Sequence, residues 1–211
     1  SFLFMGLSLL KANAPDLGKN PEMLSFVQNY TDMGFASVIL FVLIGTVLTM
    51  IVQASAATMA ITLIMCANGW ISFELGAALV LGENIGTTIT GAFAAIGGTT
   101  ESKRTALLHT FFNVIGTTIG MILLVPYVGF IQFLSDKMGV PPMMQIAVSH
   151  IIFNVGATCV FFPFTKQMCK LVSMVIKGEE AEQLDINTDV LDPALIQLPS
   201  TALSVAQNLT V

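Results

Sequence analysis

Residues 33–73 have the sequence MGFASVILFVLIGTVLTMIVQASAATMAITLIMCANGWISF, with no Asp, Glu, Lys or Arg over 41 positions. Two further charge-free runs follow, 105–135 with 31 residues and 138–165 with 28. A helix needs about 20 apolar residues to cross a bilayer. Only 10% of the chain is charged, against about 25% in an ordinary soluble domain. The sequence therefore predicts an all-α polytopic membrane protein and excludes a soluble globular enzyme.

The middle of the first run, Gln53-Ala54-Ser55-Ala56-Ala57-Thr58, has small residues and hydroxyls in place of large aliphatic side chains. A polar tract at membrane depth is tolerated only where it faces protein or water. We therefore expect residues 35–52 and 56–67 to form the arms of a re-entrant helical hairpin, with residues 53–56 near its tip. The alternative is one continuous helix whose small residues allow close packing, and the sequence alone leaves both open.

A second polar tract, Gly82-Glu83-Asn84-Ile85-Gly86-Thr87-Thr88, lies in the middle of the apolar segment 72–97. This segment is long enough for one crossing, and we expect a discontinuous transmembrane helix that is broken at the tract. Such breaks offer free backbone N–H and C=O groups to ions. Glu83 is the only charged residue between positions 75 and 100, and an intramembrane acid indicates a functional site. Its alternative role is a paired acid that holds the break together.

Two further spans are expected at 105–127 and 143–165, separated by residues 129–142, and both contain the pattern H-x-x-F-N-V. The His and Asn of each pattern are four residues apart and share one helical face; they are His109, Asn113, His150 and Asn154. Neutral His and Asn side chains can join helices by hydrogen bonds, and we favour this packing role over a proton relay or a substrate contact. A metal site at the His pair is disfavoured, because neither carboxylate nor thiolate ligands are nearby in the sequence.

The remaining polar residues exclude several other classes of function. The chain lacks the basic stripe that nucleic-acid binding requires, so no nucleic-acid partner is expected. Cys66, Cys159 and Cys169 form no C-x-x-C pair, and we interpret them as small hydrophobic residues rather than metal or redox groups. We expect no cofactor, and no metal other than a transported ion.

The positions of Lys and Arg predict the orientation. They gather in the loop 98–104 and after the last span, at Lys103, Arg104, Lys166, Lys170 and Lys177. The positive-inside rule then places this loop and the C-terminal tail in the cytoplasm, in a multi-pass protein of the cytoplasmic membrane.

The chain is expected to consist of three parts. Residues 1–177 form a transmembrane domain, whose first apolar stretch is too short to span and is interpreted as a truncated helix. Residues 178–190 form an acidic linker. Residues 191–211 begin a soluble helical domain, because Asp192-Pro193 is typical of a helix start.

Three tracts resemble motifs of the type II sodium/phosphate cotransporter family, in its bacterial branch. Residues 53–58 resemble the QSSSAT motif, residues 81–88 the LGANIGTT motif, and residues 104–113 the R-x-A-x-x-H-x-x-F-N motif. All three occur in the order and spacing of the family, and the resemblance extends over most of residues 1–165. The tail from Leu191 resembles the beginning of the PhoU-like domain that many bacterial members carry.

This resemblance implies a transporter built from two inverted repeats with one hairpin each. The chain would hold the second repeat, the last helix and the connection to the PhoU-like domain, while the first repeat would precede Ser1. The implied activity is sodium-coupled symport of inorganic phosphate by alternating access. The implied partners are phosphate, sodium ions, the lipid bilayer and the first repeat; association with a second copy of the chain stays open.

By the same resemblance, phosphate is expected to bind at Gln53, Ser55 and Thr58, while Glu83, Asn84, Thr87 and Thr88 form sodium sites or support the hairpin. The chain departs from the motifs at Ala54 and Ala56, which replace serines, and at Glu83, which replaces the common Ala. These departures keep two alternatives open: a transporter of another ion on the same fold, or a transport-inactive membrane sensor or anchor. An intramembrane enzyme is not expected, because Ser55 has neither His nor Lys at nucleophile spacing.

Overall fold

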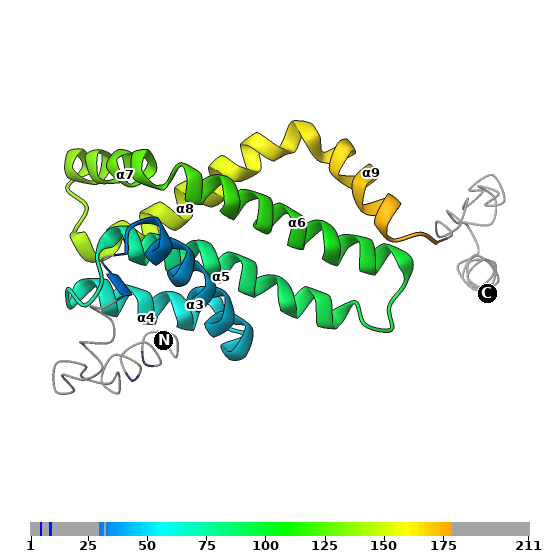
Figure 1. Cartoon of the computed structure of the whole chain (residues 1–211), viewed down its shortest axis with the longest axis horizontal. Helices are drawn as coiled ribbons and strands as arrows, with labels where there is room; N and C mark the ends of the chain where they lie inside the picture. The colour runs from blue at the N-terminus through cyan, green and yellow to red at the C-terminus, as the bar shows by residue number, and fades with distance from the viewer. Residues whose placement is uncertain (1–4, 6–8, 10–29, 32, 179–211) are drawn as a thin grey trace, which may run out of the picture. The chain divides into compact units, whose positions relative to one another are not determined.

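The computed structural model describes Met5, Leu9, residues 30–31 and residues 33–178. All regular structure in this part of the chain is helical (Figure 1), which confirms the predicted all-α class. The elements follow in the order α3 (Phe35–Val52), α4 (Ser55–Ala67), α5 (Phe73–Ala94), α6 (Thr100–Ile122), α7 (Leu124–Met138), α8 (Pro142–Phe161), the 3-10 helix η2 (Phe162–Phe164) and α9 (Thr165–Val175).

Three described segments are long and apolar enough to cross a membrane: Phe35–Val52, Thr100–Ile122 and Met144–Val175. The helix α4 is apolar but shorter. The outer surfaces of the long segments carry apolar side chains that stand free of the other helices; Ile51, Ile122 and Phe162 are 70–78% exposed. Extensive exposed apolar surface is typical of a membrane-contacting face. A helical membrane protein is thus confirmed.

The helix α5 lies between α3 and α4 on one side and α6 and α8 on the other (Figure 1). It begins where the Ser72 hydroxyl accepts a hydrogen bond from the N–H of Leu75, as an N-cap serine does. From Leu75 to Asn84 every side chain is buried, and Ala78 is completely inaccessible. The most polar helix centre of the described chain therefore lies at the centre of the bundle, where lipid does not reach it.

The expected break in the segment 72–97 is wrong, because α5 is one continuous helix from Phe73 to Ala94. Its glycines serve close packing instead: Gly82 and Gly86 lie directly against the backbone of α3. Its threonines donate to the carbonyls of the same helix, Thr87 to Glu83 O at 2.8 Å and Thr88 to Ile85 O at 2.8 Å. Each glycine weakens a helix interior by about 1 kcal/mol, and here the packing against α3 offsets that loss.

The interruption is found instead between α3 and α4. Gln53 adopts the left-handed conformation with φ 54°, and Ala54 is extended with φ −139°. The arms at 35–52 and 55–67 agree with the predicted arms to within one residue, and the alternative of one continuous helix is wrong. Beyond the break, α4 turns back alongside α5 (Figure 1).

The predicted span 105–127 and connection 129–142 are also corrected. The helix α6 begins at an N-cap in which Thr99 Oγ1 accepts from Ser102 N, and it ends at Ile122. Residues 124–138 form a separate helix, α7, whose first turn contains Pro126. Proline lacks the N–H that a continuing helix needs but is tolerated in a first turn. Gly139, with φ 64°, ends α7 in the left-handed conformation that glycine favours.

The last predicted span, 143–165, corresponds to α8 and continues through η2 into α9. The chain divides into two compact units, Ser1–Lys177 and Gly178–Val211. The predicted acidic linker 178–190 and helical segment 191–211 lie outside the described residues, apart from Gly178. The predicted truncated helix at the N-terminus also lies outside them, apart from Met5 and Leu9.

Candidate functional site

Three glycines bring α3 and α5 into backbone contact. A Cβ atom at each of them would overlap a carbonyl oxygen of the other helix: Gly45 against Leu79, Gly82 against Val42, and Gly86 against Thr46. Small residues allow this kind of approach between membrane helices. The result is a closely packed α3–α5 pair in which the polar centre of α5 lies near the break at residues 53–54.

Glu83 is buried in this polar centre, with 2% of its surface exposed. Its Oε1 accepts a hydrogen bond of 2.7 Å from the hydroxyl of Thr62 on α4. Thr58, one turn earlier on α4, also interacts with the Glu83 side chain. Among the described residues, the second carboxyl oxygen, Oε2, has no hydrogen-bond partner. The carboxyl group is therefore only half satisfied by protein.

A chain of hydroxyls connects this carboxyl group to the break. Thr49 Oγ1 on α3 donates to Thr58 Oγ1 at 3.2 Å, and Thr58 Oγ1 donates to Ser55 O at 3.0 Å. Thr49 and Thr58 are buried, whereas Gln53 and Ser55 are exposed. The structure therefore places the predicted residues of the first tract in two layers, with Gln53 and Ser55 at the surface and Thr58 beneath them.

The other side of α5 carries a separate polar contact. Asn84 Oδ1 lies 3.1 Å from His150 Nε2 of α8, so the ring donates to the amide when Nε2 carries the proton. The amide nitrogen of Asn84 is buried without a hydrogen-bond partner in the described part of the chain. Glu83 and Asn84 are consecutive in the helix and point to different neighbours, because successive residues are about 100° apart. Glu83 therefore belongs to a polar centre with Thr62 of α4, and Asn84 belongs to a second polar centre with His150 of α8.

The side chains of the remaining predicted residues form no described hydrogen bond with the side chains of these two centres; Thr87 and Asn154 bond only the backbone carbonyls of Glu83 and His150 in their own helices. The amides of Asn113 and Asn154 donate to His109 O and His150 O, each four residues earlier in the same helix. His109 is exposed and lies near Gly91, at the far end of α5. Of the two H-x-x-F-N tracts, the second therefore joins two helices through His150.

Sequence reasoning missed Thr49 and Thr62, the hydroxyl donors to Thr58 and Glu83. It also missed Thr117 on α6, whose hydroxyl donates to Leu81 O at 2.9 Å. A signal for Thr62 exists in the sequence: it follows Thr58 by four residues and so shares its helical face. The partner of that face could not be known without the packing of α4 on α5.

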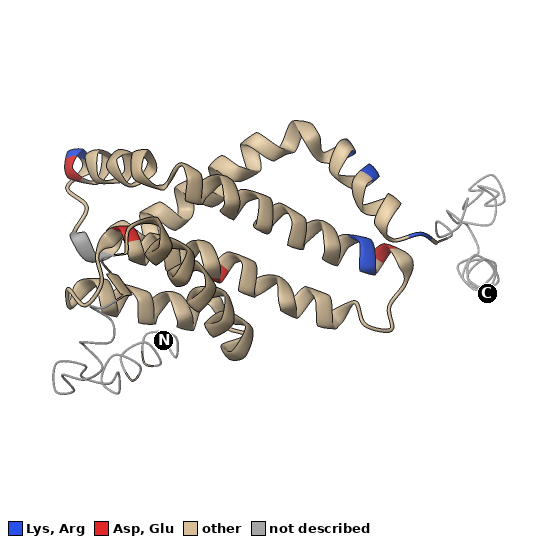
Figure 2. Cartoon of the chain, viewed as in Figure 1, with Lys and Arg blue, Asp and Glu red and all other residues tan. Residues whose placement is uncertain are grey.

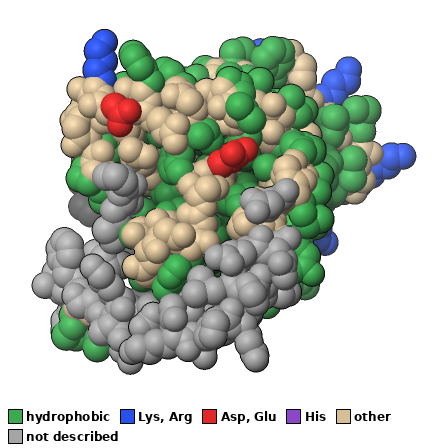
Figure 3. Space-filling view, turned by 60° about the vertical axis from the view of Figure 1, so that its left-hand side comes forward, with side chains coloured by type: hydrophobic (Ala, Val, Ile, Leu, Met, Phe, Trp, Pro, Cys, Tyr) green, Lys and Arg blue, Asp and Glu red, His purple; other side chains and the backbone are tan. Residues whose placement is uncertain are grey.

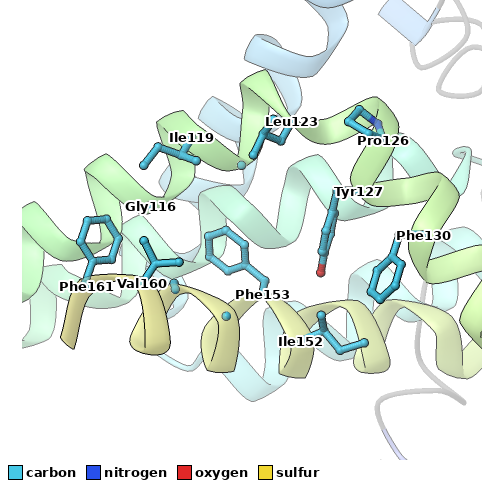
Figure 4. Close-up of a pocket in the computed structure, with 13 residues that line it drawn as sticks. Gly116, Ile119, Leu123, Pro126, Tyr127, Phe130, Ile152, Phe153, Val160 and Phe161 are labelled. Carbon is cyan, nitrogen blue, oxygen red and sulfur yellow. The ribbon is translucent and has the colours of Figure 1, made fainter. Parts of the chain in front are cut away.

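An apolar pocket of about 450 Å³ lies between α6, α7 and α8 (Figure 4). Phe153 of α8 points toward Leu123, while Phe161 lies beside Gly116 at one end of the pocket and Phe130 lies near Ile152 at the other. The hydroxyl of Tyr127, also in its lining, donates to Ser149 O. With such a lining the pocket offers few ligands to an ion, and the polar groups around Glu83 are the better candidate for an ion site.

Basic residues gather at one end of the described helices. Arg104 Nη1 pairs with Glu101 at 2.7 Å, and Arg104 Nε donates to Ile176 O at 3.2 Å. The loop before α6 and the end of α9 therefore lie together, and Figure 2 shows several basic segments there. Lys137, in the last turn of α7, lies at the opposite end.

The surface between these ends is poor in charge. The coloured part of the face seen in Figure 3 consists mainly of hydrophobic and uncharged groups, with two acidic side chains on it and basic side chains at its margins. This is the arrangement expected of a protein whose middle faces lipid and whose ends face water.

Comparison with models of protein families identifies the family of this chain. A family model described as Na+/Pi-cotransporter matches residues 2–177. The chain belongs to the Na+/Pi-cotransporter family. The resemblance that the three sequence tracts indicated is thereby confirmed.

Three relatives illustrate the range of similar proteins. "Uncharacterized protein YqeW" of Bacillus subtilis (strain 168) is 35% identical over 137 residues, which are 65% of this chain and 43% of the relative. "Putative inorganic phosphate export protein YjbB" of Escherichia coli (strain K12) is 25% identical over 174 residues, 82% of this chain and 31% of the relative. "Sodium-dependent phosphate transport protein 2C" of Rattus norvegicus is 36% identical over 87 residues, 39% of this chain and 14% of the relative.

The chain therefore spans less than half the length of these relatives in the Na+/Pi-cotransporter family. No solved structure gives a significant match.

Proposed function

We propose that the protein carries inorganic phosphate across the cytoplasmic membrane, coupled to sodium ions and by alternating access. Membership of the Na+/Pi-cotransporter family supports this function, as do relatives named for phosphate export and for sodium-dependent phosphate transport. The structural observation that carries the proposal is the helix break at Gln53-Ala54. Because of the break, the N-terminus of the apolar helix α4 lies near the buried carboxyl group of Glu83.

The beginning of α4 can bind an anion. The first N–H groups of a helix have no partner within the helix, and the helix dipole favours negative charge there. Ala54, the N-cap of α4, provides no side-chain cap, so the N–H groups of Ser55 and Ala56 are available to a ligand. Phosphate is bound in this way at helix N-termini in many proteins. The exposed side chains of Gln53 and Ser55 add an amide and a hydroxyl.

The predicted phosphate residues then have different tasks. Gln53 and Ser55 contact the anion, and Thr58 fixes the first turn of α4 through its hydrogen bond to Ser55 O. Phosphate would be held in the re-entrant hairpin formed by α3 and α4, which moves relative to the rest of the protein during transport. We assign the sodium ions to the oxygen atoms around Glu83 and Asn84, with the adjacent residues Thr87 and Thr88 supporting that part of α5.

The orientation follows from the basic end of the unit. The loop before α6 and the end of α9 lie together, and five of the six Lys and Arg residues from position 103 to 177 lie in the first turn of α6, in α9 or just after α9. By the positive-inside rule this end is cytoplasmic. The tail from residue 191, which resembles the beginning of a PhoU-like domain, would then face the cytoplasm.

Ser55→Ala tests the phosphate site. Losing a hydrogen bond to a charged ligand costs about 1.5–3 kcal/mol, so the apparent affinity for phosphate should fall about tenfold or more. The measurement is the phosphate dependence of sodium-driven uptake by the full-length protein in vesicles. Ser173→Ala is the matched control, because the Ser173 hydroxyl bonds only Lys170 O of its own helix. An unchanged affinity in Ser55→Ala would remove Ser55 from the site.

A further inference from the structure

The helix α9 follows the part of the chain that is needed for the last membrane crossing. The helix α8 has 20 residues, and at 1.5 Å per residue it is about 30 Å long, which matches the hydrocarbon core of a bilayer. The 3-10 helix η2, which contains Pro163, separates α8 from α9. Figure 1 shows the chain bending there toward the beginning of α6. The helix α9 therefore falls at the membrane boundary, at the basic end of the unit.

Three kinds of side chain divide the surface of α9. Val172 is buried, and the helix packs against α6. Lys166 and Lys170 are exposed and share one helical face, because they are four residues apart. Three apolar side chains are 44–61% exposed: Leu171, Met174 and Val175. At 100° per residue they lie between the lysine face and the buried face. This arrangement is typical of an amphipathic helix that lies in the plane of the membrane interface.

The lysines of α9 belong to a larger basic patch, which we define as Lys103, Arg104, Lys166, Lys170 and Lys177. The hydrogen bond from Arg104 Nε to Ile176 O, at 3.2 Å, joins the first turn of α6 to the end of α9, and Figure 2 shows their basic segments at the same end. Glu101 is the only acidic residue described at this end, and it pairs with Arg104. No acidic partner is described for the four lysines. The described patch therefore carries an excess of positive charge.

The partner that fits this surface must carry negative charge and apolar groups side by side. A soluble anion or an acidic peptide would meet the lysines but leave the exposed apolar side of α9 in water. An anionic phospholipid supplies both, since its phosphate is attached to its acyl chains. Lysine side chains can lie along an apolar surface while their ammonium groups reach the polar level. Basic residues next to the end of a membrane helix attract anionic lipids.

We propose that α9 and the basic patch bind anionic phospholipids in the leaflet at the basic end of the protein. The exposed apolar side of α9 contacts the upper part of the acyl chains, and Lys166 and Lys170 bind the phosphates. This contact fixes the depth at which the chain leaves the membrane after α8. The proposal goes beyond transport, because it uses none of the residues that are assigned to phosphate or sodium.

Native mass spectrometry of the full-length protein in detergent measures the binding of added phosphatidylglycerol and of phosphatidylcholine with the same acyl chains. The wild type is expected to prefer phosphatidylglycerol by about thirtyfold or more. The double variant Lys166→Gln/Lys170→Gln should bind phosphatidylglycerol about thirtyfold more weakly, because each lysine near a membrane surface strengthens the attraction of anionic lipid about fivefold. Its binding of phosphatidylcholine should not change.

Lys137→Gln is the matched control, because Lys137 lies at the opposite end of the described helices and should leave the preference unchanged. Lys166→Arg/Lys170→Arg keeps the charge and should keep the preference as well. If the double Gln variant does not fold, Lys177→Gln replaces it, with an expected weakening of about fivefold. Equal phosphatidylglycerol affinity of the wild type and a folded Gln variant overturns the proposal. So does equal affinity of the wild type for the two lipids.

The acidic residues that follow the patch in the sequence are the rival partner, and they include Glu179, Glu180 and Glu182. The triple variant Glu179→Gln/Glu180→Gln/Glu182→Gln distinguishes the two partners in the same measurement. The lipid proposal expects the same preference for phosphatidylglycerol in the wild type and in this variant. A preference that appears only in the variant would show that the acidic residues occupy the patch, and it would overturn lipid binding by the native protein.

Discussion

Gln53→Gly is expected to abolish most sodium-driven phosphate uptake while leaving the helix break intact. Gln53 is the only residue other than glycine with positive φ among the described residues, a conformation that costs a non-glycine residue about 1–2 kcal/mol. Glycine adopts it freely, so this substitution relieves strain and removes only the side chain. Because the amide can donate two hydrogen bonds to the anion, we expect a loss of about a hundredfold in apparent phosphate affinity.

Gln53→Ala separates the effect of losing the amide side chain from the effect of relieving backbone strain. Alanine also lacks the amide but keeps the strain, so the two variants should lose affinity to the same degree if the amide binds phosphate. The measurement is the phosphate dependence of uptake in vesicles, with Gln167→Ala on the exposed surface of α9 as the control. Wild-type affinity in Gln53→Gly would mean that position 53 serves the backbone turn alone.

Among the substitutions considered, Gly82→Ala is expected to lower the stability of the folded protein the most. The new methyl group would overlap the carbonyl oxygen of Val42 on α3, and backbone atoms cannot move aside as a flexible side chain can. Overpacking of this kind costs about 1–3 kcal/mol, and we expect a value at the upper end. Thermal unfolding of the purified protein in detergent measures the effect.

Gly129→Ala is the matched control for that substitution. Gly129 also lies inside a helix, α7, but a Cβ atom there would meet nothing within 4 Å. Replacing a glycine within a helix by alanine should then stabilise the protein by about 0.5–1 kcal/mol. Equal stability of the two variants would show that α3 and α5 are not in backbone contact.

The sequence indicated a hairpin tip near residues 53–56 but left one continuous helix open as the alternative, and it predicted a second break that α5 does not have. Both tracts combine small and polar residues, and such residues serve either an interruption or close packing between continuous helices. The two cases differ in whether the tract packs against the backbone of a neighbouring helix. Gly82 and Gly86 meet the backbone of α3, and no sequence pattern within α5 reveals that contact.

The candidate site was predicted in its residue types more than in its geometry. Glu83 stood out because a charge inside an apolar span is costly. Its actual partner, Thr62, comes from another helix, and the separation of Glu83 from Asn84 depends on which helices pack on the two sides of α5. The helix α7 was missed because residues 129–142 were predicted to connect two spans, whereas Pro126 lies in the first turn of a new helix that continues to Met138.

Radiolabelled phosphate uptake into vesicles that contain the full-length protein tests whether it is a sodium-coupled phosphate transporter. We predict that phosphate accumulates when an inward sodium gradient is imposed and that it does not accumulate when choline replaces sodium. Preloaded vesicles with the opposite gradient measure export in the same way. Folded, inserted protein that moves no phosphate in either direction, or moves it equally well without sodium, would contradict this function.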